Sequence, residues 1–145
     1  MRTFTITALL ITALFVAVSC TAKPAQASYE DGTYRGVFID NNVQQVGVEF
    51  TLKDNVVTKA GFRHLEYGRI NYRTSEDPLI QGMRGQYQQL LDYLVGKDIR
   101  TSLKDLYQSG SIVTENVDAF SGATLRAGKV ISAVRDGLNR GVYSY

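Results

Sequence analysis

Apolar and polar residues alternate along the first half of the chain, and the alternation is clearest over residues 46–52. A period of two places successive side chains on opposite faces of a strand, so one face is expected to be buried and the other wet. The apolar positions are Val46, Val48, Phe50 and Leu52. Residues 33–39 and 56–65 are rich in β-branched and aromatic residues, and turn-forming residues at 40–42 and 54–55 separate the three segments. The pattern predicts an antiparallel meander of three strands.

Beyond residue 77, apolar residues recur at intervals of three and four, as they do on one face of a helix. Pro78 suits the first turn of such a helix, and Gly96 suits its C-terminal end. Its apolar face comprises Ile80, Met83, Tyr87, Leu90, Leu91 and Leu94. A shorter helix is expected around residues 99–106, and a last helix is expected to end near Gly141. The apolar face of the last helix comprises Val130, Ile131, Val134 and Leu138.

Two segments lack a regular pattern. Residues 67–77 are polar with interleaved aromatic residues and predict a loop that has room for one short extended piece, and residues 111–115 favour an extended segment. The predicted class is α+β, with an antiparallel β-meander sheet packed against helices. The chain has 145 residues, which corresponds to one domain.

The first 19 residues predict an export signal rather than part of the fold. Arg2 precedes an uncharged, apolar run that reaches Ser19, as in a secretory signal peptide. Cys20 follows directly, in an arrangement that resembles a bacterial lipobox, where the cysteine is acylated and becomes the mature N-terminus. Residues 20–28 would then be a polar tether, and residues 29–145 the domain. The sequence Ala-Gln-Ala before Ser28 fits ordinary signal-peptide cleavage as an alternative.

Cys20 is the only cysteine, so it has no intramolecular disulfide partner. Acylation would give this thiol a role, whereas ordinary cleavage would discard it. Both alternatives predict an exported domain in the cell envelope. The lipoprotein alternative also anchors the domain to a membrane, at its periplasmic or extracytoplasmic face.

Composition argues against several classes of function. The net charge is +2 and no basic run is present, so nucleic acid is not an expected partner. The chain has one histidine, one cysteine, and neither a CxxC nor an HxxxH pattern, so no metal site is predicted. The histidine, His64, stands near the end of a predicted strand, where we expect a surface or capping role rather than a general base.

The segment before the last helix has the composition of an anion site. Asp118 and Ser121 are both good N-cap residues, and the small residues Gly122 and Ala123 allow another molecule to approach the backbone. With Ser121 as the cap, Thr124 falls in the first turn, beside N–H groups that have no intrahelical partner. A plain helix start with no ligand accounts for these residues equally well.

Charge near this helix start favours the same kind of ligand. Arg126 and Lys129 follow the small residues within two helical turns. Both would add positive charge to that of the helix dipole, which is positive at its N-terminal end.

The order of residues 118–124, Asp-Ala-Phe-Ser-Gly-Ala-Thr, matches D-x-x-S/T-G-A-T/S and resembles the flavinylation motif of the FMN-binding domain family. Members include covalent flavin subunits of the sodium-pumping quinone reductase and Rnf complexes, and secreted flavoproteins of extracellular electron transfer. Residues 31–36 (DGTYRG) and 46–62 also look like the opening strands of that family. The resemblance covers roughly residues 29–141.

The resemblance implies a covalent cofactor. A flavin transferase would use FAD as the donor and attach FMN through a phosphodiester to Thr124, and Asp118, Ser121, Gly122 and Ala123 would form the surroundings. The protein would be an electron carrier or redox subunit rather than a stand-alone enzyme, with redox proteins or a quinone-linked complex as partners. The aromatic residues Tyr67 and Tyr72, with Arg69, are candidates to flank the flavin ring.

Two other functions remain open at this point. The chain could be a module that binds a flavin or another phosphate ligand non-covalently, or a ligand-free envelope lipoprotein that scaffolds a membrane complex. A flavin that remains with the unfolded chain would separate covalent attachment from both.

Overall fold

The predicted α+β class is confirmed by a computed structural model, which describes residues 27–114 and 120–144. Within that part, one antiparallel sheet has the strand order β1-β2-β3-β4. Its strands are β1 (Gly32–Asp40), β2 (Val43–Lys53), β3 (Val56–Tyr67) and β4 (Ile70–Asn71). The helices are α1 (Pro78–Asp92), α2 (Ile99–Ser102), the 3₁₀ helix η1 (Leu103–Ser111) and α3 (Phe120–Arg140). The predicted signal peptide and Cys20 lie outside the described residues.

The two predicted hairpin turns are both present. Asn41 and Asn42 have φ values of 48° and 63°, and Asp54 and Asn55 have 50° and 64°. Two consecutive positive φ values define the type I′ turn, whose twist matches that of the flanking strands and which favours Asn and Asp. These turns fix the antiparallel pairing of β1 with β2 and of β2 with β3.

The helices cover one face of the sheet, and the alternating apolar residues of β2 point to them. Val46, Val48, Phe50 and Leu52 are each at most 2% exposed. The opposite face carries charges, among them Glu49, whose Oε2 lies 2.7 Å from Arg35 Nε and 3.0 Å from Arg63 Nη1. This division matches the predicted alternation of buried and wet faces.

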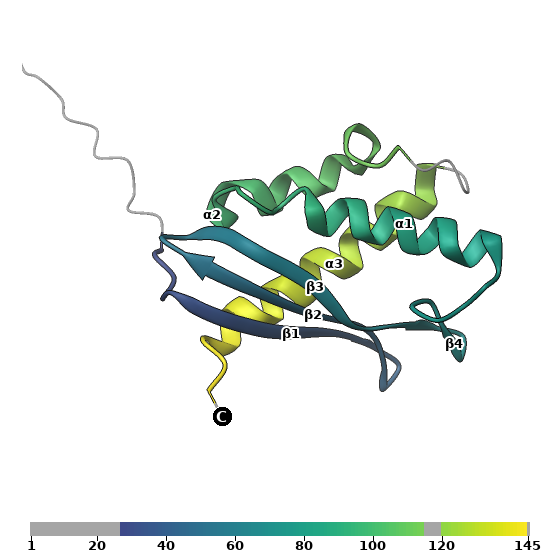
Figure 1. Cartoon of the computed structure of the whole chain (residues 1–145), viewed down its shortest axis with the longest axis horizontal. Coiled ribbons are helices and arrows are strands. Elements are labelled where there is room, and N and C mark those ends of the chain that lie inside the picture. Colours follow the sequence, from purple (N-terminus) through teal and green to yellow (C-terminus); the bar gives the residue numbers. More distant parts are fainter. Residues whose placement is uncertain (1–26, 115–119, 145) are drawn as a thin grey trace, which may run out of the picture.

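The C-terminal helix α3 runs obliquely across the sheet, and α1 and η1 pack along it (Figure 1). Its closest approach to a strand is made by Gly36 of β1 and Gly137 of α3, because a Cβ atom on Gly36 would lie 2.0 Å from the Ala133 carbonyl oxygen. The Asp136 carboxylate also accepts a hydrogen bond from the Val37 backbone N–H, at 2.8 Å. Two glycines therefore let α3 dock directly on the backbone of β1.

Helix α1 begins as predicted and ends earlier than predicted. Asp77 caps it by accepting hydrogen bonds from the backbone N–H groups of Leu79 and Ile80. The helix ends at Asp92, and Gly96, predicted as its stop, has a φ of 80° in the following segment. There its N–H donates to the Val57 carbonyl oxygen at 2.7 Å. Pairing with β3 therefore takes these residues out of the helix.

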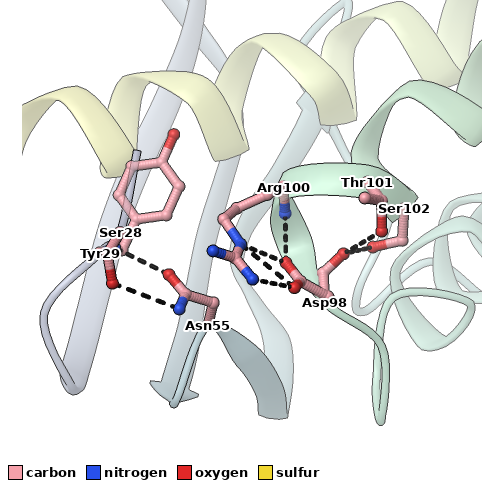
Figure 2. A network of polar contacts seen from close by, with 7 residues as sticks. All are labelled: Ser28, Tyr29, Asn55, Asp98, Arg100, Thr101 and Ser102. Atoms are coloured by element: carbon pink, nitrogen blue, oxygen red, sulfur yellow. Dashed lines mark hydrogen bonds and ion pairs between the residues drawn. The ribbon is translucent and has the colours of Figure 1, made fainter. Parts of the chain in front are cut away.

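The start of the domain is held by the side chain of Asn55, and Asp98 on a neighbouring loop caps the helix beside it (Figure 2). The Tyr29 backbone N–H donates to Asn55 Oδ1 at 2.8 Å, and the Asn55 carbonyl oxygen accepts from the Ile99 N–H at 2.9 Å. Asp98 caps α2 by accepting from the Arg100 N–H at 2.9 Å. These contacts fix the N-terminal end of the sheet beside α2.

The segment at residues 67–77 agrees with its prediction: β3 extends to Tyr67, a two-residue turn leads into the short strand β4, and residues 72–77 form turn and loop. The prediction of an extended segment at residues 111–115 was wrong at its start, since η1 continues to Ser111 and Ile112 lies in a turn. Glu115, the last residue of that predicted extended segment, lies outside the described part of the chain. Among the helices of the described residues, none has the length and apolarity needed to cross a bilayer.

Candidate functional site

Helix α3 begins at Phe120, which changes the expected capping of this helix. Ser121 lies inside the helix and is therefore not the cap, and Thr124 is the fifth helical residue rather than part of the first turn. Asp118 and the side chain of Ser121 lie outside what the structure describes. The remaining motif residues, Gly122, Ala123 and Thr124, are placed within α3.

These three residues have different surroundings. Ala123 is 6% exposed and packs into the interior, Gly122 is half-buried, and Thr124 is exposed. Because Thr124 is exposed, a modifying enzyme can reach it. Ala123 lies on the buried side of α3, where it packs the helix against the rest of the domain. The arrangement is compatible with chemistry at Thr124, which is the role that the motif predicts.

A cavity of about 220 Å³ opens beside this end of α3. One wall comes from the β3–α1 region and the other from α3. The wall from the β3–α1 region consists of Tyr67, Tyr72, Met83 and Tyr87, and the α3 wall of Gly122, Leu125, Arg126 and Lys129. Tyr67 and Tyr72, two of the three candidates to flank a flavin ring, thus lie at the motif helix, while Arg69 does not line this cavity.

One part of the aromatic wall is buried and another part is exposed. Tyr72 and Tyr87 are 6% and 4% exposed, and their rings meet edge to face with centroids 6.3 Å apart. Burial raises the pKa of Tyr87, so its phenol stays neutral at physiological pH. Tyr67, by contrast, is 55% exposed at the mouth of the cavity. A flat ligand would find a buried aromatic floor and an exposed ring at the rim.

Two cations of α3 face this aromatic wall. Arg126 is 8% exposed, and its Nη1 donates to Oε1 of the buried Gln86 at 2.6 Å. Lys129 Nζ donates to Gln45 Oε1 at 2.7 Å and lies 4.6 Å from the centre of the Tyr67 ring. Their positive charge adjoins the motif, as the sequence predicts.

Thr124 itself does not line the cavity. Gly122, Arg126 and Lys129 follow a spacing of four and three residues and so share one face of α3. Thr124 is two residues beyond Gly122, which turns it by roughly 200° about the helix axis. A ligand joined to Thr124 reaches the cavity only if a flexible chain separates its ring from the point of attachment.

FMN, the cofactor that the resemblance implies, has such a chain, because the ribityl phosphate lies between the ring and any ester oxygen. The cavity offers aromatic and sulfur-containing walls for a flat ring and two cations for negative charge. The donor set therefore fits the cofactor.

Sequence reasoning did not assign Met83, Tyr87 and Leu125 to a site. The helical periodicity of α1 placed Met83 and Tyr87 on its buried face, and both do pack against the core. The sequence does not show that one end of this face of α1 lines a cavity instead of being fully covered by other elements. Leu125 is 68% exposed, and only its position beside the motif could have indicated a role.

Other candidate positions lie away from this cavity. His64 Nε2 donates to the Gln44 carbonyl oxygen at 2.8 Å, which agrees with the predicted surface role. A larger cavity of about 410 Å³ lies where residues 141–144 cross β1 and β2, with Arg35, Arg63 and Tyr143 among its lining residues. Gly122, Ala123 and Thr124, the motif residues whose surroundings the structure describes, do not line it, so we place the candidate site at the start of α3.

Comparison with known proteins adds no assignment. No protein-family model, curated protein or solved structure matched this chain. In residues 27–114 and 120–144, no group of three or more His, Cys, Asp or Glu side chains is placed to hold a metal ion. The functional argument therefore rests on the motif and on the geometry around it.

Proposed function

We propose that this protein is an exported electron-transfer flavoprotein that carries FMN covalently, through a phosphodiester to Thr124. The observation that carries the proposal is the motif at residues 118–124, whose last residue is exposed on α3. The same helix forms one wall of an aromatic cavity with two cations. A flavin transferase would attach the FMN, with FAD as its donor. Acylated Cys20 would anchor the domain to the membrane.

The bound flavin would supply one- and two-electron chemistry, and the chain's own residues would position it. Thr124 would hold the phosphate through its oxygen. Tyr72, Met83 and Tyr87 would form an apolar floor that limits access of water to the ring. Tyr67, which is exposed at the rim, would cover the outer side.

A carrier rather than a stand-alone enzyme is favoured because the sequence shows no evident substrate domain and no second redox centre. An exposed rim allows electrons to pass to a redox protein or a quinone-linked complex that docks there.

Covalent attachment is tested by expressing the chain with a flavin transferase and viewing denatured protein for flavin fluorescence. Wild type should fluoresce, and Thr124→Ala should be dark. Thr124→Ser keeps a hydroxyl that the motif allows and should fluoresce. Thr101→Ala removes another exposed threonine and should leave the flavin fluorescence unchanged.

Two results would favour a different function. Yellow native protein that loses its colour on denaturation would indicate a non-covalent flavin module. Colourless protein in the presence of active transferase would support a ligand-free scaffold. The anchor has a separate test, since Cys20→Ser should abolish metabolic labelling by a fatty acid, and labelling that persists would refute acylation at this residue.

A further inference from the structure

The side-chain ammonium of Lys129 places a positive charge in the wall of the cavity. It projects from the third turn of α3 to the aromatic wall, where its Nζ lies 4.6 Å from the Tyr67 ring centre and 6.0 Å from that of Phe38. The residue is half-buried. A charge in this position is shielded from water more than a surface lysine, so its field acts more strongly on whatever occupies the cavity.

Among the described residues, neutral groups contact this charge. Lys129 Nζ donates to the amide oxygen of Gln45 at 2.7 Å, and Gln45 Nε2 in turn donates to Asp40 Oδ2 at 3.3 Å. No carboxylate of these residues lies within ion-pair distance of Lys129. The amide of Gln45 thus links Lys129 to Asp40, an acid that acts on its pKa.

Lys129 brings a positive charge to the wall of the cavity. Burial lowers the pKa of Lys129, with Arg126 adding to this effect and Asp40 opposing it. Arg126, the second cation of the wall, donates from its Nη1 to the amide oxygen of Gln86 at 2.6 Å. A ligand that gains negative charge inside this cavity would therefore be stabilised relative to its neutral form.

We propose that Lys129 sets the redox balance of the cofactor by stabilising the negatively charged, reduced flavin ring in this cavity. The inference rests on the proposed function. Reduction of the neutral ring by two electrons and one proton gives a ring with one negative charge. Lys129 keeps its own proton throughout, and its role is electrostatic, through a charge that is in place before the electrons arrive.

The experiment uses the full chain loaded with FMN by a flavin transferase, and the intact mass is measured first. The loaded protein is then titrated with dithionite as the reductant, in the presence of an indicator dye, and the ratio of reduced to oxidised flavin is read from the absorption spectrum. The variants are Lys129→Met, which removes the charge, and Lys129→Arg, which keeps it. Lys59→Met is the matched control, because Lys59 is exposed on β3 and does not line this cavity.

At the ambient potential where wild type is half reduced, the ratio of reduced to oxidised flavin should fall about tenfold in Lys129→Met. That change corresponds to a midpoint potential lower by about 30 mV for a two-electron couple. Lys129→Arg and Lys59→Met should stay within threefold of wild type. This combination of results would show that the charge of Lys129, rather than its packing, determines the ratio of reduced to oxidised flavin.

A ratio within threefold of wild type in loaded Lys129→Met would overturn the role of Lys129 and leave the proposed function intact. An equal fall in Lys129→Arg would also overturn it, since the effect would then follow shape rather than charge. A wild-type protein with no flavin mass would refute the proposed function, and the inference with it.

Discussion

The contact between Gly36 and α3 gives the sharpest prediction for the fold. A Cβ atom on Gly36 would lie 2.0 Å from the Ala133 carbonyl oxygen, 2.3 Å from the Gly137 nitrogen and 2.8 Å from the Gly137 Cα. All three are backbone atoms, so no side-chain rotation relieves the clash. Ordinary contact begins at 3.4 Å, and α3 would have to move away from β1 by the difference, 3.4 − 2.0 = 1.4 Å.

The cost of that movement can be worked from its parts. Overpacking of a tightly packed contact costs about 1–3 kcal/mol. The hydrogen bond from the Val37 N–H to Asp136, at 2.8 Å, would be stretched, with a loss of about 1 kcal/mol. The alanine recovers about 0.5–1 kcal/mol of backbone entropy. We therefore expect Gly36→Ala to lower the free energy of unfolding by about 2 kcal/mol and the Tm by roughly 8 °C.

The assay is urea unfolding of the purified domain, followed by far-ultraviolet circular dichroism. Gly61→Ala is the matched control, because a Cβ there meets nothing within 4 Å, and its stability should change by less than about 1 kcal/mol. A Gly36→Ala variant within 1 kcal/mol of wild type, or one no less stable than Gly61→Ala, would refute the close docking of α3 on β1.

Two further predictions concern single polar groups. Asp77→Ala removes the cap that accepts from the Leu79 N–H at 2.8 Å, and should lower the free energy of unfolding by about 1 kcal/mol; a loss below 0.3 kcal/mol would contradict this role. Hydrogen bonding from Arg35, followed by that from Arg63, lowers the pKa of Glu49 below its usual 4.5. The stabilisation by Glu49 is therefore present above that value and lost as pH falls through the lowered pKa. Glu49→Gln should reduce stability at pH 6 and not at the acid end of the titration, and a pH-independent difference would exclude this linkage.

Most of the fold could be predicted from the sequence because its strands and hairpin turns depend on residues that are close together in the chain. The period of two in β2 and the Asn and Asp residues of both hairpin turns each specify geometry within a few residues. The stop of α1 was misplaced because pairing of the Gly96 segment with β3 is a long-range effect. The close approach of Gly36 and Gly137 is of the same kind, since the two residues are 101 positions apart (137 − 36).

The site could be predicted only in part. The motif identified Thr124 as the residue of interest, and the aromatic residues of the segment at 67–77 suggested Tyr67 and Tyr72. The contribution of Tyr87 depends on how α1 crosses α3, which no local pattern encodes. Of the two candidate caps, Ser121 is excluded because α3 already includes Phe120 and Ser121, and Asp118 lies outside the described residues.

The central claim is that Thr124 carries the flavin, and peptide mass spectrometry tests it most directly. Protein coexpressed with a flavin transferase is digested, and the peptide that contains Thr124 is fragmented. The account predicts that this peptide gains the mass of one FMN less one water, with the added mass on Thr124 and absent from Thr124→Ala. An unmodified Thr124 peptide from protein made with active transferase, or the same mass on another residue, would contradict it.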